Sequence, residues 1–269
     1  SPTGQQLYPV IVAGDIFDSW KSSPEIVNVA LSHLPSIHAV YGNHDLPNHD
    51  PGSLRRSAFW TLVKGGKLTP LEPGNPVEVN GGGQILRLHG FPFGSKVKPL
   101  KEPHDMALEI VVVHAFIYSR KTGYVGAPKE QHVYGWEHKL KGYDAAVFGD
   151  NHVPFSYRQK NNDKACLMVN CGGFIRRTVT EREHRPSACL LYSDGTVKRH
   201  RLDVSQDQFI DGDKLKAVAG GIDFQDFIAE LSTLADAAID FASQVRRTLE
   251  REEVPDAVRQ IILNALEKE

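Results

Sequence analysis

The chain carries four short motifs of oxygen and imidazole donors, each at the end of an apolar run. In order they are Gly14-Asp15-Ile16-Phe17-Asp18, Gly42-Asn43-His44-Asp45, Val113-His114-Ala115 and Gly149-Asp150-Asn151-His152. None of them supplies a thiol, so the donors suit divalent manganese, iron or zinc in a hydrolytic site. A carboxylate shared by two such ions can hold them about 3.5–4 Å apart, an arrangement that clamps an in-line displacement at phosphorus.

The apolar runs predict the β-strands that must position these motifs. Apolar, β-branched stretches occupy residues 9–14, 37–42, 84–90, 109–115, 145–149, 165–173 and 187–195. Several end at glycine followed by polar residues, as strands do that deliver functional loops at their carboxyl ends. Residues 22–34 and 53–66 predict helices, the first with Ser23 as N-cap and the second closed by Gly65. Early strand–helix alternation and a late hairpin over 192–202 indicate a mixed α/β sandwich.

Length, charge and cysteine content bound the class of protein. The 269 residues can bury a large core and leave an extension. The net charge of −2 is uneven, because residues 1–206 hold 24 basic and 19 acidic residues whereas residues 207–269 hold 7 basic and 14 acidic ones. Three cysteines, Cys166, Cys171 and Cys189, are expected to be buried reduced thiols. With no apolar run long enough for a transmembrane helix, we expect a cytoplasmic protein without a membrane partner.

Residues 207–269 predict an acidic helical tail that follows the main domain. Apolar residues recur at helical spacing over 223–245 and again over 254–269. A helix over the longer stretch would measure about 34 Å, and its apolar stripe must be covered. It could fold back on its own domain, pair with a second copy as a homodimer, or receive the helices of another protein.

In order and residue type, the four motifs resemble those of the calcineurin-like metallophosphoesterases, and the resemblance covers roughly residues 9–202. It implies an α/β fold in which residues 1–206 form a four-layer α/β/β/α sandwich with residues 207–269 as a C-terminal helical extension. It also implies a hydrolase of phosphate esters that uses two divalent metal ions. Mn²⁺ is the first choice, and Mg²⁺, Fe and Zn²⁺ are the others.

The resemblance implies a role for each metal-binding residue. Asp15 bridges the two ions, Asn43 and His114 bind the second, and His152 binds the first. Asp150 stands where the family normally has a histidine. A carboxylate there is a competent ligand, and it favours manganese or magnesium over zinc.

Two further residues of the second motif are implied to act in catalysis. His44 would lie over the scissile phosphate and protonate the leaving oxygen or stabilise developing charge. Asp45 would orient His44 from behind, as carboxylates do for histidines at metal sites. Asp18 is expected to be structural or to lie outside the metal shell.

The family also opens with a strand that ends in Asp-x-His and supplies two ligands of the first metal. Residues 1–14 contain no Asp and no His. We therefore expect the domain of residues 1–206 to lack this first strand and its motif. A motif upstream of Ser1, and a family member that dispenses with the first metal, are both left open.

Residues 169–178 and 185–202 look like the corresponding stretches of the DNA-repair exonuclease branch, the SbcD-like one with its phage-encoded relatives. This similarity implies a nuclease acting on DNA, with a coiled-coil ATPase as a possible partner of the tail. Nine basic residues near the same strand ends could contact backbone phosphates. They are Arg120, Lys121, Lys129, Lys139, Lys141, Arg158, Lys160, Arg176 and Arg177.

Two other functions fit the same sequence. A small-molecule phosphatase or cyclic-nucleotide phosphodiesterase would use the same site without a basic track. A catalytically defective binding or scaffold subunit would follow from a missing Asp-x-His motif. The sequence does not decide between endonuclease and exonuclease action, and it leaves the native metal and the oligomeric state open.

Overall fold

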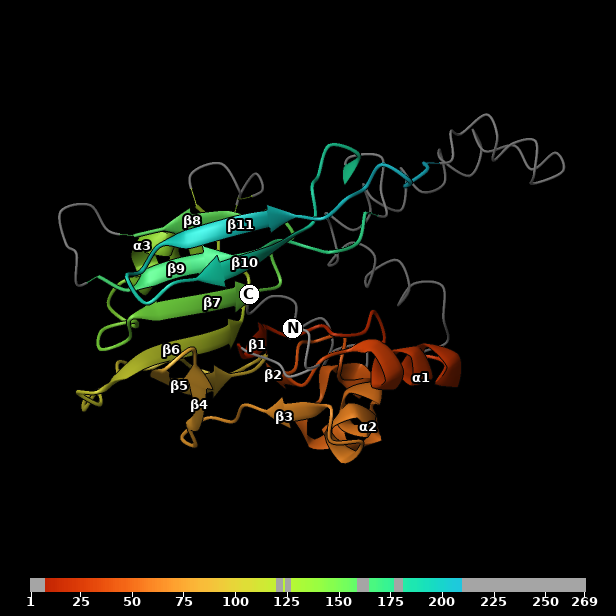
Figure 1. The fold of residues 1–269 in the computed structure, drawn as a ribbon, viewed down its shortest axis with the longest axis horizontal. Coiled ribbons are helices and arrows are strands. Elements are labelled where there is room, and N and C mark those ends of the chain that lie inside the picture. The colour runs from red at the N-terminus through yellow and green to blue at the C-terminus, as the bar shows by residue number, and fades with distance from the viewer. Residues whose placement is uncertain (1–7, 120–122, 124–126, 159–164, 177–180, 210–269) are drawn as a thin grey trace, which may run out of the picture. The chain divides into compact units, whose positions relative to one another are not determined.

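The computed structural model describes residues 8–119, 123, 127–158, 165–176 and 181–209. The chain divides into two units, Ser1–Asp207 and Gln208–Glu269, and almost all the described residues belong to the first (Figure 1). The helices expected over 223–245 and 254–269 lie outside the described residues. Within the part of the chain that the structure describes, no helix has the length and apolar character needed to cross a bilayer.

The first unit has a mixed α/β fold of many short elements. In chain order these are β1 (Val10–Val12), α1 (Pro24–His33), β2 (Ile37–Ala39), η1 (Pro47–His49), η2 (Pro51–Arg56), α2 (Ala58–Lys64), β3 (Leu68–Pro70), β4 (Val77–Gly81), β5 (Gln84–Phe91), β6 (Ala107–His114), η3 (Lys129–Gln131), α3 (Val133–Trp136), β7 (Ala145–Gly149), β8 (Phe155–Tyr157), β9 (Leu167–Asn170), β10 (Ser187–Leu191) and β11 (Val197–Arg201). Each of the seven apolar runs contains a strand, so the prediction of a mixed α/β fold is confirmed.

The strands form two sheets and a separate hairpin (Figure 1). β1, β2 and β3 are parallel neighbours in a three-stranded sheet. The larger sheet has the order β4-β5-β6-β7-β9-β8, in which β5, β6, β7 and β9 are parallel and the two edge strands are antiparallel. Parallel neighbours end at the same edge of their sheet, so each sheet can present its functional loops on one side.

The register of the strands places the motifs side by side. In the smaller sheet Val12 pairs with Ala39, so the loops that begin with Gly14 and Gly42 leave neighbouring strands at the same level. In the larger sheet His114 is the residue opposite Gly149, which directly precedes Asp150.

Burial on both faces of the larger sheet explains its continuous apolar strands. In β6, Ile110 and Val112 pack in a cluster that also contains residues of β1 and of the segments after β2 and β3. The alternate residues Val111 and Val113 pack on the other face against Trp136 of α3. Successive side chains of a strand point to opposite faces, so a strand buried on both sides is apolar throughout.

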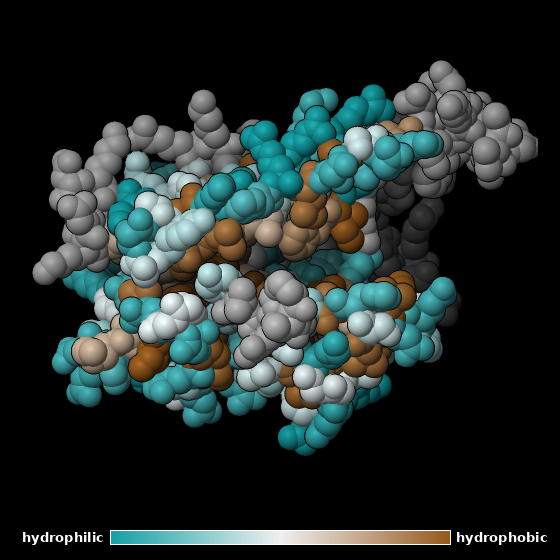
Figure 2. All heavy atoms as spheres, viewed as in Figure 1, coloured by the Kyte–Doolittle hydropathy of each residue, from teal (hydrophilic) through white to brown (hydrophobic). Residues whose placement is uncertain are grey.

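The hairpin β10–β11 packs on the larger sheet through its apolar side chains. Cys189, Leu191 and Val197 contact the cluster that contains Leu167 and Val169 of β9. Figure 2 shows the hydrophilic outer surface of this hairpin with hydrophobic residues gathered beneath it. This packing closes one side of the larger sheet and holds the hairpin beside the segment that follows β9.

The helix expected over 53–66 is divided in the structure. Residues Pro51–Arg56 form a 3₁₀ helix, η2, and α2 begins only after Ser57, whose backbone is extended (φ −102°, ψ 160°). The Ser57 hydroxyl accepts a hydrogen bond from the Trp60 N–H at 3.3 Å and caps the new helix. A serine can initiate a helix in this way, so it separates two short helices here. The N-cap at Ser23 and the end of the second helix at Gly65 are confirmed.

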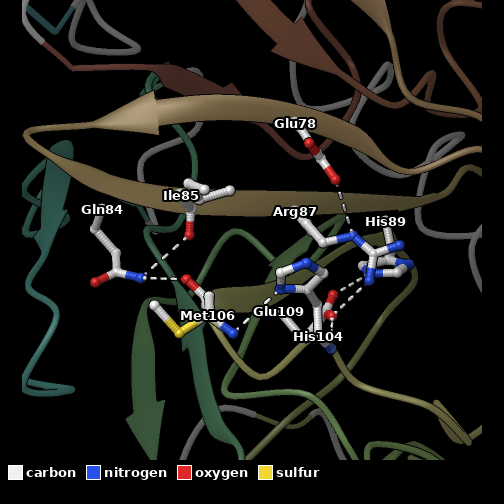
Figure 3. Close-up of polar contacts among 8 residues, drawn as sticks. All are labelled: Glu78, Gln84, Ile85, Arg87, His89, His104, Met106 and Glu109. Atoms are coloured by element: carbon white, nitrogen blue, oxygen red, sulfur yellow. Dashed lines mark hydrogen bonds and ion pairs between the residues drawn. The ribbon is translucent and has the colours of Figure 1, made fainter.

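A buried polar cluster ties β5 to β6 away from the motifs (Figure 3). The Glu109 carboxylate, 1% exposed, accepts hydrogen bonds from Arg87 Nη1 at 2.8 Å and from the His104 N–H at 2.7 Å. Its other oxygen lies 2.5 Å from Nε2 of His89. A buried carboxylate with this many partners is stabilised in its charged form and fixes the pairing of the two strands.

Candidate metal centre

Asp15, Asn43 and His114 converge where β1, β2 and β6 end. Nε2 of His114 lies 3.1 Å from Oδ1 of Asn43 and 3.4 Å from Oδ2 of Asp15. The imidazole of His114 is fully buried, and a quarter of the Asp15 side chain is exposed. Three of the predicted metal ligands, from three different motifs, are thus brought together at one point.

The orientation of His114 suits a cation at this point. Its Nδ1 lies 2.7 Å from the carbonyl oxygen of Ala13, which only accepts, so Nδ1 carries the proton. The neutral ring then turns the Nε2 lone pair toward the oxygens of Asn43 and Asp15. Three lone pairs that face one another with no proton between them repel, and a divalent ion would stabilise them. The donors present therefore fit a metal ion.

The other oxygen of Asp15 is occupied by the backbone of the second motif. Oδ1 of Asp15 accepts a hydrogen bond from the His44 N–H at 3.0 Å. Oδ2 is the oxygen that faces His114 and is left for an ion. The carboxylate thus joins the loops after β1 and β2 while it keeps one oxygen directed into the centre.

Two glycines permit the close approach of these side chains. A Cβ atom at residue 42 would lie 1.9 Å from Oδ1 of Asp15, and one at residue 14 would lie 2.2 Å from Nδ1 of His114. Gly14 also has φ +93°, which disfavours other residues. The glycine that opens each of these two motifs is therefore required by the side chain of another motif.

Both carboxylate residues of the candidate centre adopt backbone conformations that are unusual for residues other than glycine. Asp15 has φ 52° and Asp150 has φ 81°. Such conformations cost of order 1–3 kcal/mol and persist where the surrounding structure imposes them, which occurs often at functional sites. Neither was visible in the sequence, since aspartate only tolerates this region better than most residues do.

The predicted partnership between Asp45 and His44 is corrected by the structure. Asp45 is completely buried, and its Oδ2 accepts hydrogen bonds from the N–H groups of Asp15 and Gly42, both at 2.9 Å. Nδ1 of His44 instead lies 2.9 Å from the carbonyl oxygen of Asp18. Asp45 therefore holds the backbone of the two loops, and the Asp18 carbonyl orients the imidazole. Burial raises the pKa of Asp45 to about 6, although the Gly42 N–H acts in the opposite direction.

Asp150 and His152 lie at the end of β7, and they differ in their surroundings. Asp150 is partly buried, which raises the pKa of its carboxyl; the electrostatic interaction with His114 lowers it and that with Asp15 raises it. The side chain of His152 is 70% exposed, and its Nδ1 lies 3.5 Å from Oε1 of Glu181. The structure therefore places Asp150 within the electrostatic influence of the centre and turns His152 toward Glu181.

Within the described residues, no three His, Cys, Asp or Glu side chains meet as a metal-binding group. Of the three side chains that do converge, Asp15 and His114 belong to these types and the third donor is the amide of Asn43. A small open hollow of about 240 Å³ adjoins them. It is lined by Asp18, Ser19, Trp20, Asn43, His44, Leu46, Asn48 and His49.

Three of the nine basic residues expected at the strand ends serve other contacts. Arg176 forms an ion pair with Asp207 at 2.6 Å, and its side chain is only 6% exposed. Nη2 of Arg158 donates to the carbonyl oxygen of Gly195 at 3.2 Å. Lys139 lies over the ring of Trp136. These three residues give no support to a phosphate-binding track, and Arg120, Lys121, Lys160 and Arg177 lie outside the described residues.

Three contributors to the centre were missed in the sequence. The carbonyl oxygens of Ala13 and Asp18 fix the two imidazoles, and Glu181 lies beside His152. Backbone carbonyls leave no trace in residue type, so no sequence signal could reveal them.

The comparisons with known proteins agree with the convergence of the motifs. Residues 4–154 match the profile of the calcineurin-like phosphoesterase family, Metallophos, and this range is more than half of the chain. No curated protein matches the chain. The chain belongs to the calcineurin-like phosphoesterase family, whose members generally use divalent metal ions.

Proposed function

We propose that this protein is a metal-dependent phosphodiesterase that hydrolyses DNA. The observation that carries the proposal is the convergence of Asp15, Asn43 and His114, with His44 beside them. These three side chains would hold one divalent ion, and Asp150 with His152 would contribute to a second. Mn²⁺ is our first choice because the donors are mainly oxygens. The fold would be the four-layer sandwich of the family, in its SbcD-like branch.

The size of the hollow supports a polymeric substrate over an enclosed small molecule. Pockets that enclose small ligands usually measure about 300–1,000 Å³. The hollow beside His44 measures about 240 Å³ and is open to solvent. Only the reacting phosphate of a substrate would fit there, and the rest would lie along the surface. Because Arg158 and Arg176 serve other contacts, they would add little to the affinity for DNA or to its dependence on salt.

In the proposed mechanism, His44 and Asp45 have different roles in hydrolysis. When bound, divalent ions polarise the phosphoryl oxygens and stabilise the negative charge that develops at phosphorus. Nδ1 of His44 donates a hydrogen bond to the Asp18 carbonyl oxygen. Nε2 is therefore the nitrogen that would donate a proton to the leaving oxygen. Asp45 holds the N–H groups of Asp15 and Gly42 and thereby keeps the two loops in position.

The proposal is tested with the full chain, Mn²⁺, linear DNA and bis-p-nitrophenyl phosphate. Asp15→Asn keeps an acceptor for the His44 N–H but removes the charge that faces the ion. We expect the parent to hydrolyse both substrates, and we expect the rate of the variant to be lower by at least about 10²-fold on each. The matched control is Asp50→Asn, an exposed helix-capping aspartate whose replacement should leave both rates unchanged.

The possible outcomes separate the alternatives. Hydrolysis of the small diester without cleavage of DNA would favour a small-molecule phosphodiesterase. Absence of turnover on both substrates, with Mn²⁺ still bound, would favour a binding or scaffold subunit. Full activity in Asp15→Asn would show that the metal centre is assigned to the wrong residues.

A further inference from the structure

Two cysteines lie together between the hairpin and the larger sheet. Cys171 directly follows β9, and Cys189 is the middle residue of β10. Both are free thiols, and both are only partly buried. Each thiol shifts the pKa of the other, although 17 residues separate them in the sequence.

The backbone around this pair is held by several hydrogen bonds. The carbonyl oxygen of Cys171 accepts hydrogen bonds from Oγ of Ser187 and from Nη1 of Arg199, both at 3.1 Å. Ser187 lies two residues before Cys189 on the same face of β10, and Arg199 is the residue opposite Cys189 on β11. These bonds hold the backbone of Cys171 beside the paired residues Cys189 and Arg199 of the hairpin, independently of the rotamers of the two thiols.

The two sulfur atoms have complementary properties. A hydrogen bond from Cys171 lowers the pKa of Cys189 to about 7, and the charge of Arg199 acts in the same direction. The same hydrogen bond and burial raise the pKa of Cys171. A thiol with a pKa near 7 is a good nucleophile at neutral pH. By contrast, burial raises the pKa of Cys166 to about 12 and leaves it inert.

We propose that Cys171 and Cys189 form a reversible disulfide by exchange with a low-molecular-weight disulfide. The Cys189 thiolate attacks one sulfur of the small disulfide, forms a mixed disulfide and releases one small thiolate. Cys171 then loses its proton, attacks Sγ of Cys189 and releases the second. The protein thiols are oxidised, the small disulfide is reduced to two thiols, and atoms and electrons balance. The pair is separate from the proposed hydrolysis.

The position of the pair suggests what the bond would affect. Cys171 lies between Asn170, whose Nδ2 donates to the Asn151 carbonyl at 2.7 Å, and Gly173, whose N–H donates to the His152 carbonyl at 3.1 Å. The segment that follows β9 thus supports the loop of the last motif. A bond from Cys171 to β10 would tie that segment to the hairpin.

The test treats the full chain at neutral pH with oxidised glutathione and then with dithiothreitol. We expect the intact mass to fall by two hydrogens, a peptide map to link Cys171 with Cys189, and the reductant to reverse both changes. The closed loop is short, so the melting temperature should rise by about 5 °C. Cys166→Ser should form the same bond, whereas Cys189→Ser should not.

A second measurement does not depend on how the variants fold. In the reduced parent protein, limiting iodoacetamide should alkylate Cys189 first and Cys166 last. A stable glutathione adduct, an unchanged mass, or a link that includes Cys166 would overturn the proposal. Fastest alkylation at Cys166 would overturn it as well.

Discussion

Backbone carbonyls orient both imidazoles that matter at the candidate centre. His114 is fixed by Ala13 and His44 by Asp18, through Nδ1 in each case. The other nitrogen, Nε2, is thereby left without this carbonyl contact, and in our proposal it faces an ion in His114 and the substrate in His44. The same chemical group would then serve two purposes, because the two rings face different neighbours.

At the level of single residues, we predict that His44→Ala impairs turnover but not metal binding. The His44 side chain contacts the Asp18 carbonyl, and its backbone N–H, which the substitution keeps, contacts Asp15. The rate on bis-p-nitrophenyl phosphate should fall by about 10²–10⁴-fold, the usual contribution of a general acid. Titration with Mn²⁺ should give the same affinity as for the parent.

The control for this prediction is His33→Ala, which changes an exposed histidine in the last turn of α1. Both the rate and the affinity should be unaffected. If His44→Ala lost an ion, His44 would have to be a ligand and the role of Nε2 given above would be wrong.

How much of the site the sequence reveals can be judged from these residues. The order of Asp15, Asn43 and His114 along the chain predicted their convergence, because each follows a strand. The partner of His44 was predicted wrongly, since Asp45 is a chemically reasonable choice and the Asp18 carbonyl is invisible in the sequence. The positive φ of Asp15 was not predicted either, since only the folded chain fixes that angle.

At the level of elements, one buried carboxylate, that of Glu109, stabilises the pairing of β5 with β6. Burial would raise the pKa of Glu109, but the His104 N–H, His89 and Arg87 together hold that pKa below its ordinary value of 4.5. A carboxyl whose folded-state pKa is depressed stabilises the fold above its unfolded-state pKa. That contribution is lost as the pH falls through the folded-state value.

We therefore predict that Glu109→Gln lowers the free energy of unfolding by about 3 kcal/mol at pH 7, because it removes the buried partner of Arg87 and leaves this largely buried charge to the exposed carboxylate of Glu78. The difference from the parent should shrink progressively as the pH falls below 4.5, because the unfolded chain binds the proton first, and it should vanish once the folded-state carboxylate is protonated as well. Urea unfolding at pH 7 and at pH 3.5 measures both values.

The matched control is Glu78→Gln, which removes the exposed carboxylate on the other side of Arg87. Exposed ion pairs contribute about 0–1 kcal/mol, so this variant should resemble the parent. Equal losses for Glu78→Gln and Glu109→Gln, or a loss for Glu109→Gln that does not change with pH, would contradict the prediction.

β3, β4 and β8 were not predicted, and the physical reason is the same for all three. β3 and β8 have three residues each, and β4 lies at the sheet edge with alternating exposure. Pairing with a neighbour stabilises such strands, and their own composition carries little signal. The central strands were found because both of their faces are buried.

At the scale of the whole molecule, the described site residues all lie within the first unit. Asp15 to His152 span the motifs, and the ion pair between Arg176 and Asp207 reaches the end of that unit. We propose that residues 208–269 serve self-association or a coiled-coil partner. Their acidic composition disfavours contact with DNA.

We predict that deletion of residues 208–269, which keeps Asp207 and its ion pair, leaves the hydrolysis of bis-p-nitrophenyl phosphate within about twofold of the parent, since every proposed site residue is retained. The same deletion should lower the number of chains per particle, measured by light scattering, if the parent self-associates. An unchanged number of chains per particle together with lost hydrolysis would place the tail in the catalytic domain.

The burial of Asp45 has a consequence for the motions of the centre. One carboxylate accepts the N–H groups of Asp15 and Phe17 in one loop and of Gly42 in the other. Neither loop can open to solvent without leaving a buried negative charge short of partners. The two loops must therefore open together, as one cooperative unit whose amide protons exchange with solvent at a shared rate.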